Sequence, residues 1–414
     1  MTLSISSVEL TWSQLDALAR QHGNSFFLAD LDRFRLNFTR LRDCFQARYP
    51  RTAIAYSYKT NYLPAFARLA DDLDAHAEVV SWFEYEYARA LGVDSRRIIF
   101  NGPIKSRSDL TRAIIEGAWL NVDSLDELRT LLDLDLSVSA PVAVGLRCHL
   151  GDNTPGSRFG IDLASDAGRR AVAAIDGAKQ YRLAGLHVHH SANRRAEAYR
   201  ERAARIVAVH REELDDRPLE YIDIGGGFAG PMPPELSSQV GVTETYDDYA
   251  EAIGSIMRDA YGEDGPILIL EPGMALVSDA MTFVTRVEVL KSAPGADYAV
   301  VDGSVFNIKP LRHSINLPLL PVRRPGVHGM AGIWDVVGHT CMERSVDLLH
   351  SGYRGTLSQG DFVMLSNVGA YSTVLNAPFI HGTPPILSIV GGRANRVLRR
   401  ASTARDLLAS YEQQ

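Results

Sequence analysis

Short apolar runs alternate with amphipathic stretches through the first two thirds of the chain. Each run holds a few residues of Val, Ile, Leu or Ala and is bounded by polar residues, Gly or Pro. This pattern is typical of strands that are buried on both faces. Eight runs are therefore expected to form strands: Ala53–Tyr58, His76–Ser81, Arg97–Phe100, Ala118–Val122, Pro141–Leu146, Arg182–His189, Leu219–Ile224 and Pro266–Leu270.

The stretches between these runs have helical spacing. Near the start of the chain, apolar residues recur at steps of three or four and so share one face of a helix: Leu31, Phe34, Phe38, Leu41 and Phe45. The segment 196–214 has the same spacing, and we interpret the Arg and Glu side chains of its other face as a solvated surface. Its apolar positions are Tyr199, Ala203, Ile206, Val207 and Leu214.

Eight strands that alternate with helices over about 230 residues predict a (β/α)8 TIM barrel, whose usual size is about 250 residues. A doubly wound open sheet is the alternative, and it would favour fewer strands and a glycine-rich first turn. The first turn here reads Tyr58-Lys59-Thr60-Asn61 and contains no glycine. The pattern therefore favours the barrel.

The pattern of apolar and polar residues changes after about Met281. Further strand-like runs follow, separated by Gly and Pro, and long helical periodicity is absent until Ala404–Tyr411. The expected strands are Thr282–Leu290, Tyr298–Val301, Phe362–Leu365 and Ile386–Val390. These features predict an α/β fold class with a barrel over residues 27–281. Residues 1–26 and 282–414 are expected to form a mostly β domain of the Greek-key or sandwich kind.

Composition narrows the class of protein. The 414 residues are 46% apolar and 22% charged, which is ordinary for a globular protein and excludes a disordered chain. A net charge of −7 offers no global basic field, so no nucleic-acid partner is expected. No run of 18 apolar residues and no secretory signal is visible, which favours a cytoplasmic protein without a membrane partner.

The cysteines give no sign of a metal or of a disulfide framework. Only Cys44, Cys148 and Cys341 occur, and none of them has the Cys-x-x-Cys spacing of a zinc site. We therefore predict no metal, and each cysteine has to be judged by its surroundings.

Chemically capable residues follow several of the expected strands. In a (β/α)8 enzyme the active site lies on the loops after the carboxyl ends of the strands, so these residues are expected to share one rim. They are Lys59, Asn101-Gly102-Pro103, Arg147, His187 with His189, Asp223-Ile224-Gly225-Gly226-Gly227 and Glu271-Pro272-Gly273.

Each of these groups has a plain structural interpretation beside a functional one. Three successive glycines from Gly225 let a backbone approach an anion, or simply form a flexible turn. Lys59 is an amine for a Schiff base, or a structural lysine. Glu271 is a partner for a protonated ring nitrogen, or a carboxylate at a helix start. His189 stacks on the ring of a ligand, or it is a structural histidine whose polar atoms are satisfied by the protein. Taken together they supply what pyridoxal phosphate (PLP) requires.

The same residues resemble a known family. Tyr56-Ser57-Tyr58-Lys59-Thr60-Asn61 is similar to the lysine motif of the fold-type III PLP decarboxylases, the diaminopimelate and ornithine decarboxylase group with its alanine racemase-type barrel. Further likenesses follow in the family's order over nearly the whole chain: Phe27–Asp32, Asn101–Lys105, Asn121–Leu128, Ser157–Gly160, Leu186–His189, Asp223–Phe228, Glu271–Gly273, His339–Glu343 and Gly369–Tyr371.

The resemblance implies roles for these residues. Lys59 would hold PLP through a Schiff base, Glu271 would pair with the pyridine nitrogen, and His189 would stack on the ring. The phosphate would be bound by Gly225, Gly226, Gly227 and Tyr371, with Ser191 nearby. Cys341 would return a proton after CO2 leaves, reaching the site from the partner subunit of a homodimer. The implied substrate contacts are Arg158, Lys309, Glu343, Asp347 and Tyr371.

Departures from the family pattern point to an altered substrate. Met274 stands where the family has a phosphate-binding Arg, so Ser191 or Arg194 is expected to take over that contact. Met342 replaces an acidic residue, and Glu343 and Asp347 stand near it. Lys309 occupies the place of an Arg before Pro and loses the bidentate grip on a carboxylate.

We therefore expect PLP-dependent decarboxylation of an amino acid related to diaminopimelate, ornithine or lysine. A conjugated amino acid of a biosynthetic pathway, such as a carrier-protein-bound one, fits the departures better than plain diaminopimelate. Two alternatives stay open. One is an amino-acid racemase on the same fold, and the other is a decarboxylase-like regulatory protein without activity.

Overall fold

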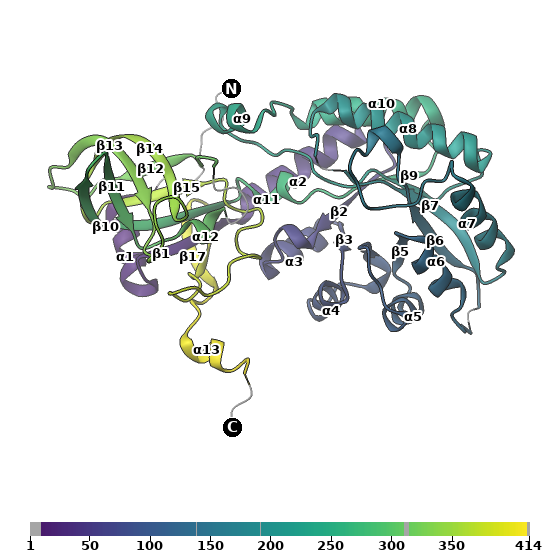
Figure 1. Ribbon diagram of the computed structural model, residues 1–414, viewed down its shortest axis with the longest axis horizontal. Coiled ribbons are helices and arrows are strands. Elements are labelled where there is room, and N and C mark those ends of the chain that lie inside the picture. Colours follow the sequence, from purple (N-terminus) through teal and green to yellow (C-terminus); the bar gives the residue numbers. More distant parts are fainter. Residues whose placement is uncertain (1–9, 138, 191, 310–313, 412–414) are drawn as a thin grey trace. The chain divides into compact units, whose positions relative to one another are not determined.

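The computed structural model describes residues 10–137, 139–190, 192–309 and 314–411. The chain divides into two compact units (Figure 1). One unit, the barrel unit, comprises residues 37–229 and 242–275. The other, the β unit, comprises residues 1–36, 230–241 and 276–414.

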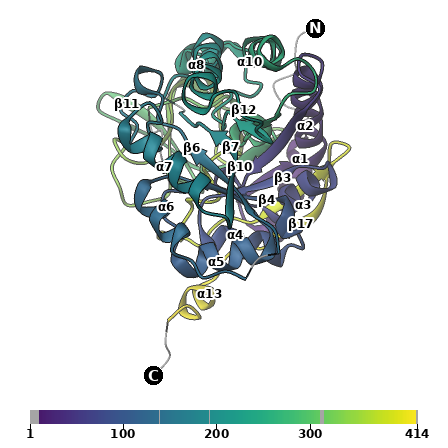
Figure 2. The ribbon, with the colours of Figure 1, turned by 90° about the vertical axis from the view of Figure 1, so that its right-hand side faces the viewer.

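The barrel unit contains a closed barrel of eight parallel strands, each lying within or beside one of the eight apolar runs. The predicted (β/α)8 architecture is thus confirmed. β2 pairs with β9, which closes the barrel, and Figure 2 shows helices around the strands. The strands are β2 (Thr52–Ser57), β3 (His76–Val79), β4 (Ile98–Phe100), β5 (Trp119–Val122), β6 (Val142–Arg147), β7 (Tyr181–His187), β8 (Tyr221–Asp223) and β9 (Ile267–Leu270).

The helices around these strands bury the apolar stripes that the spacing indicated. Phe38 and Leu41 of α2 and Tyr199 of α8 are at most 1% exposed. Ser106 and Thr245 begin α5 and α10 with capping boxes, which satisfy otherwise unpaired backbone N–H groups. The helices are α2 (Leu31–Gln46), α3 (Pro64–Asp72), α4 (Trp82–Ala90), α5 (Arg107–Glu116), α6 (Leu125–Leu132), α7 (Asp166–Gly177), α8 (Ala196–Leu214), α10 (Tyr246–Tyr261) and α11 (Met274–Val277), with 3-10 turns η1 (Tyr58–Thr60), η2 (Ser95–Arg97) and η3 (Gly151–Asn153).

The β unit is built on one nine-stranded sheet with the order β14-β13-β11-β10-β1-β16-β17, and β15 pairs with both β10 and β12. The sheet is mixed, because β1 pairs with β16 and β11 with β13 in parallel. Its strands are β1 (Ser25–Asp30), β10 (Met281–Ala293), β11 (Ala296–Val301), β12 (Leu319–Val322), β13 (Met330–Val337), β14 (Leu348–Leu357), β15 (Phe362–Ser366), β16 (Ile386–Val390) and β17 (Arg393–Arg399). Among the described residues, these strands are accompanied by the helices α1 (Trp12–His22), α9 (Pro234–Val240), α12 (Val305–Ile308) and α13 (Ala404–Leu408).

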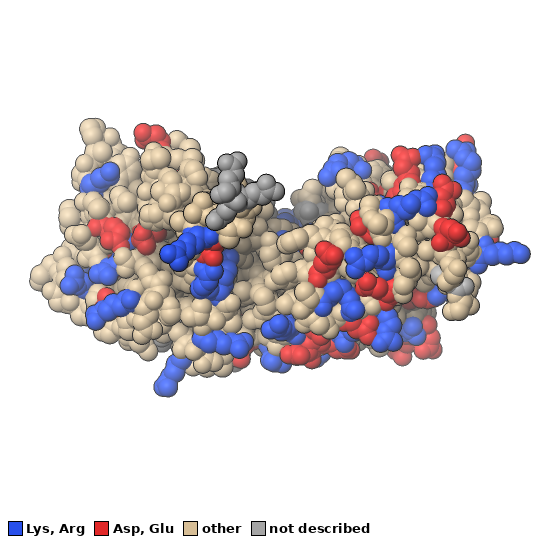
Figure 3. Space-filling model, turned by 90° about the horizontal axis from the view of Figure 1, so that it is seen from below, with Lys and Arg blue, Asp and Glu red and all other residues tan. Residues whose placement is uncertain are grey.

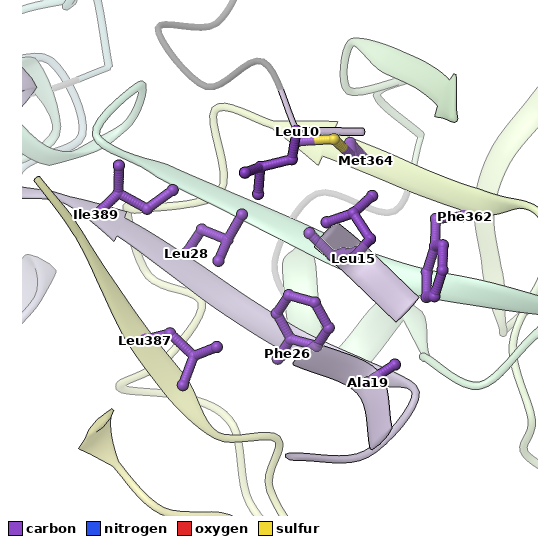
Figure 4. Packing of buried hydrophobic residues seen from close by; sticks show 10 residues of the cluster. Leu10, Leu15, Ala19, Phe26, Leu28, Phe362, Met364, Leu387 and Ile389 are labelled. Carbon is purple, nitrogen blue, oxygen red and sulfur yellow. The ribbon is translucent and has the colours of Figure 1, made fainter. Parts of the chain in front are cut away.

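The core of the β unit joins residues from the two ends of the chain (Figure 4). Leu15 of α1 packs with Phe26 of β1, Phe362 of β15 and Leu387 of β16, all at most 2% exposed. Each such side chain contributes about 1.5–3 kcal/mol when it is removed from water. The N-terminal segment is therefore an integral part of this unit.

The predicted domain boundary at residue 27 needs correction. β1 pairs with β10 and β16, and residues 1–36 cluster with the β unit. The segment 230–241 also belongs to that unit. The apolar run Ser25–Asp30 is buried throughout, and such a run looks the same whether it opens a barrel or joins a mixed sheet.

The described surface agrees with the composition. In the part of the chain that the structure describes, no helix is both long and apolar enough to cross a membrane. Figure 3 shows one face of the molecule, on which Lys and Arg side chains are interspersed with Asp and Glu. No broad basic field of the kind that attracts nucleic acid is visible on that face.

Candidate active site

Lys59 lies in η1, directly after barrel strand β2. Its Nζ is 2.5 Å from Oε2 of Glu78 on β3, and the same oxygen accepts a 2.6 Å hydrogen bond from Ser57 Oγ. The Glu78 side chain is 1% exposed, whereas that of Lys59 is 30% exposed. The ammonium is thus held by a buried counter-ion and remains accessible from one side.

A chain of polar side chains connects Lys59 to Glu271 through the barrel interior. Asn101, which follows β4, donates through Nδ2 to Glu78 Oε1 at 3.2 Å and also to Glu271 Oε1. Asn121 Nδ2 donates to Asn101 Oδ1 at 2.8 Å. Buried polar groups of this kind are stable only when they are paired, so the network fixes both carboxylates in place.

Two buried carboxylates, Glu271 and Asp223, share the centre of the site with His187. Burial alone would raise the pKa of Glu271, but the neighbouring His187 and the charge of Lys59 outweigh it and lower that pKa. Burial and the Glu271 charge raise the pKa of Asp223 well above its usual range. The environment therefore keeps Glu271 ionised and Asp223 protonated, which separates their chemical roles.

The glycine loop after β8 packs against His189 and Glu271. Gly226 N–H donates to His189 Nδ1 at 2.9 Å, and Gly225 N–H donates to Asp223 Oδ1 at 2.8 Å. A Cβ at Gly226 would lie 2.0 Å from the Glu271 carbonyl oxygen, and Gly227 has a φ of +92°. No other residue fits this approach without displacing the backbone.

His189 is a neutral imidazole in this setting. Burial, helped by the positive charges of Lys59 and Arg147, lowers its pKa to about 3, although Glu271 opposes the shift. Because Nδ1 accepts the Gly226 N–H, the ring proton is on Nε2. A neutral ring held at one nitrogen is suited to stacking on a flat ligand.

The residues present fit PLP. Lys59 offers the amine, Glu271 an ionised carboxylate, His189 a flat ring and the glycine loop a close backbone approach. Within the described ranges, Asp223 Oδ2 and both nitrogens of His187 are buried without a hydrogen-bond partner. Buried polar atoms without partners cost free energy, which a polar ligand would recover.

Arg194 lies beside Met274, the residue that follows Glu271-Pro272-Gly273. One guanidinium N–H of Arg194 points at the sulfur of Met274. Tyr249 anchors this part of the loop after β7, because its OH donates to the Arg194 carbonyl at 2.6 Å. Ser191, the other predicted substitute for the missing arginine, lies outside the described residues.

The remaining predicted residues are placed as follows. Arg158 is an exposed residue of the barrel unit whose guanidinium lies 4.2 Å from the Phe159 ring centroid. In the β unit, Cys341 and Glu343 are exposed on the turn after β13. The Lys309 ammonium donates to the Ile315 carbonyl, and burial lowers the pKa of Lys309 to about 8. Tyr371 has a φ of +58°, in the left-handed region.

Asp347 does not fit its predicted role as a substrate contact. Asp347 is 1% exposed and lies inside the β unit. The carboxylate accepts hydrogen bonds from Ser304 Oγ at 2.9 Å, Val305 N at 2.8 Å and Thr340 Oγ1 at 2.6 Å. These donors occupy both oxygens, so we do not include Asp347 among the proposed substrate contacts.

Sequence reasoning assigned no role to several residues of the site: Glu78, Asn101, His187 and Asp223. Glu78 was detectable as a charged residue inside an apolar run. His187 was detectable because it lies two residues from His189, and such residues point to the same face of a strand. The carboxylate pairing of Asp223 with Glu271 depends on the neighbouring strands β8 and β9, which no local motif reveals.

Comparison with known proteins identifies the class. The family described as pyridoxal-dependent decarboxylase, pyridoxal binding domain, matches residues 33–278, which is more than half of the chain. The chain belongs to this family. It is a PLP-dependent amino-acid decarboxylase, and the predicted cofactor is confirmed by the family's pyridoxal binding domain.

Individual relatives are distant but match over almost their full length. A diaminopimelate decarboxylase of Methanothermobacter thermautotrophicus is 27% identical over 94% of this chain and 92% of the relative. An L-glutamyl-[BtrI acyl-carrier protein] decarboxylase of Niallia circulans is 26% identical over 98% of each chain. The crystal structure of a diaminopimelate decarboxylase from M. jannaschii has the same fold, with a TM-score of 0.85 at 22% identity over 96% of this chain and 94% of that one.

Proposed function

We propose that this decarboxylase acts on an amino acid whose distal end differs from that of free diaminopimelate, with Lys59 as the amine that holds PLP. The observation that carries the role of Lys59 is its connection to Glu271 through Glu78 and Asn101 at one end of the barrel strands. This arrangement places an amine and an ionised carboxylate in one buried network.

Different residues of the chain have different roles around the cofactor. PLP, when bound, supplies an electron sink for the electron pair left as CO2 departs. Glu271 keeps a ring nitrogen protonated, because its own pKa is lowered. Glu78 holds the Lys59 ammonium and can accept its proton when the amine has to react. His189 would stack against the ring of the bound cofactor.

Fewer N–H groups of the glycine loop are available to bind phosphate than its three glycines suggest. The N–H groups of Gly225 and Gly226 already donate to Asp223 and His189. We propose that Gly227 supplies the N–H of this loop to the phosphate, and that the two earlier glycines make the close packing possible. Arg194 adds the positive charge that the family usually draws from the position of Met274.

The β unit supplies the proton and reads the substrate. We propose that the exposed Cys341 returns a proton to the α-carbon, from a second copy of the chain in a homodimer. Tyr371 contacts the phosphate, and Lys309, Glu343 and Arg158 contact the substrate. Lys309 stands in place of an Arg, and Met342 stands in place of an acidic residue. The site therefore lacks two groups that could bind a second amino and carboxylate group at the distal end of the substrate.

A conjugated amino acid is therefore the preferred substrate class. The Niallia circulans relative, whose name states an L-glutamyl group on an acyl-carrier protein, spans 98% of each chain and supports this preference. The decisive screen measures CO2 release from both enantiomers of ornithine, lysine, arginine and glutamate, from diaminopimelate and from carrier-bound glutamate. Activity on diaminopimelate alone would contradict the proposed substrate class.

Replacement of Lys59 tests the catalytic assignment. Wild-type protein should show a Schiff-base absorbance band that borohydride abolishes, whereas Lys59→Ala should lack that band and lose at least about a thousandfold in turnover. A colourless wild-type protein would favour the regulatory alternative. Interconversion of enantiomers without CO2 release would favour the racemase.

A further inference from the structure

Three metal-binding side chains meet in the β unit, apart from the residues assigned to PLP. Asp302 follows β11, His339 follows β13, and His381 lies in the segment before β16. One ligand atom from each residue lies within 4.8 Å of the others. The residues are far apart in sequence, so no local spacing signals the cluster.

His339 is oriented as a metal ligand. Its Nδ1 lies 3.0 Å from the Gly303 carbonyl oxygen, so Nδ1 carries the proton and Nε2 has a free lone pair. Nε2 is shielded from solvent and has no hydrogen-bond partner in the described part of the chain. Histidines that bind metals usually donate their other ring N–H to a carbonyl or carboxylate in this way.

His381 completes the histidine pair. Its ring stacks on that of His339, with centroids 3.8 Å apart and an interplanar angle of 9°. Its Nδ1 is 3.8 Å from Asp302 Oδ1, and its side chain is 52% exposed.

A carboxylate makes the cluster attractive to a cation. Asp302 Oδ1 faces His381 Nδ1 and lies beside both imidazoles. A divalent ion would bind this carboxylate and would also engage the free lone pair of His339.

We propose that Asp302, His339 and His381 bind a divalent transition metal ion of the Zn2+ class. Two imidazoles and one carboxylate favour Zn2+, Co2+ or Ni2+ over Mg2+ and Ca2+, which prefer oxygen ligands alone. With Zn–N distances of about 2.1 Å, tetrahedral ligands lie about 3.4 Å apart. Because the lone pair of an imidazole lies in the plane of its ring, the stacked and exposed His381 side chain has to turn before it can face the same ion as His339, and Asp302 has to close toward that ion.

The occupied site would tie three segments of the sheet together. Three protein ligands leave a fourth position for water, or for Glu288 if its side chain turns from Asn24, to which it is now bonded at 3.0 Å. His339 is two residues from Cys341, so the metal would also fix the turn that carries this thiol. Metal binding itself does not depend on the function proposed for Cys341.

Titration of the PLP-loaded full chain with Zn2+ tests the proposal. The protein is prepared without a histidine tag, dialysed against a chelator and followed by calorimetry. We expect one tight Zn2+ per chain, and an affinity at least about tenfold weaker in His381→Ala and in His339→Ala. His328→Ala removes an exposed histidine of the same unit and should bind as wild type does.

Co2+ provides a second readout that does not depend on affinity. Visible d–d absorption of tetrahedral intensity should appear with wild type and with His328→Ala, and should be lost in His381→Ala. Circular dichroism and the PLP absorbance verify that the variants are folded, and the exposed position of His381 makes its replacement mild. Equal Zn2+ affinity in wild type and in both cluster variants would overturn the proposal.

Discussion

At the scale of single residues, the active site depends on two carboxylates with opposite protonation. Glu271 and Asp223 lie on neighbouring barrel strands, and the cationic groups around Glu271 decide which of them is ionised. The same rule holds for His189, whose neutrality follows from burial and nearby positive charge. Local electrostatics, rather than residue type alone, therefore sets each role.

Arg194 is the residue whose role is most open to test. Arg194→Met should weaken PLP binding by about 10- to 100-fold, because one charge-assisted hydrogen bond is worth about 1.5–3 kcal/mol. The measurement is an absorbance titration of the cofactor-free protein with PLP. Arg195→Met is the matched control, since Arg195 is 66% exposed and pairs with Glu244.

A second substitution shows whether position 274 and Arg194 serve the same phosphate. Adding Met274→Arg to Arg194→Met should restore PLP affinity, because the charge returns to the place that the family uses. Unchanged PLP affinity in Arg194→Met would show instead that its guanidinium only packs on Met274.

Lys309 predicts a pH dependence of substrate binding. Its pKa is lowered to about 8 by burial, so the ammonium is present below pH 8 and is lost above it. If it binds a substrate carboxylate, KM should be flat below pH 8 and rise about tenfold per pH unit above it. Lys309→Arg, which stays charged, should abolish this rise, and an identical alkaline rise in both proteins would remove Lys309 from the substrate site.

At the scale of elements, the close contact between the loop Gly225–Gly227 and Glu271, the residue after β9, holds the site together. Gly226→Ala places a Cβ 2.0 Å from the Glu271 carbonyl oxygen, so the loop or Glu271 must move. We expect loss of PLP absorbance and a fall of about 1–3 kcal/mol in the free energy of unfolding. Chemical denaturation and a PLP titration measure the two effects.

Gly177→Ala is the matched control for that experiment. Gly177 ends α7, and a Cβ there would meet nothing within 4 Å. Its free energy of unfolding should stay the same or rise by about 0.5–1 kcal/mol, as for other glycines in helices. Equal stability and PLP binding in the two variants would show that the loop has room for a side chain.

The sequence predicted the elements that are continuous and strongly patterned. All eight barrel strands were found, because strands buried on both faces are apolar throughout. β12, β13, β14 and β17 were missed. β13, β14 and β17 are only partly buried and contain polar residues or Gly, and β12 is a short, partly buried run that contains Pro. β1 was not among the predicted strands, and its residues from Phe27 onward were assigned to the barrel, because its partners lie more than 250 residues away.

The same reasoning applies to the site. Lys59, His189, Glu271 and the glycines follow strands in short motifs, so they could be named from sequence. The Glu78 counter-ion and the Asn101 bridge become visible only when β2, β3 and β4 lie side by side. No local spacing marks His339 and His381 as a pair, because tertiary structure alone brings residues 339 and 381 together.

At the scale of the whole molecule, the proposed homodimer predicts that defective chains can complement each other. Lys59→Ala and Cys341→Ala, each inactive or slow alone, should regain activity when they are mixed after partial denaturation and refolding. If each site uses Lys59 of one chain and Cys341 of the other, random pairing restores about a quarter of wild-type activity. Activity no higher than the sum of the single variants would contradict a shared site.

The pairing of β1 with β16 has a consequence for synthesis at the ribosome. β1 ends at Asp30, but its parallel partner begins only at Ile386, more than 350 residues later. At roughly 5–20 residues per second, the apolar side chains of β1 wait roughly 20–70 seconds for that neighbour. β1, the first strand of the described residues to leave the ribosome, is thus among the last to gain all its partners, and a chain cut short before β16 would leave one edge of β1 unpaired and prone to aggregation.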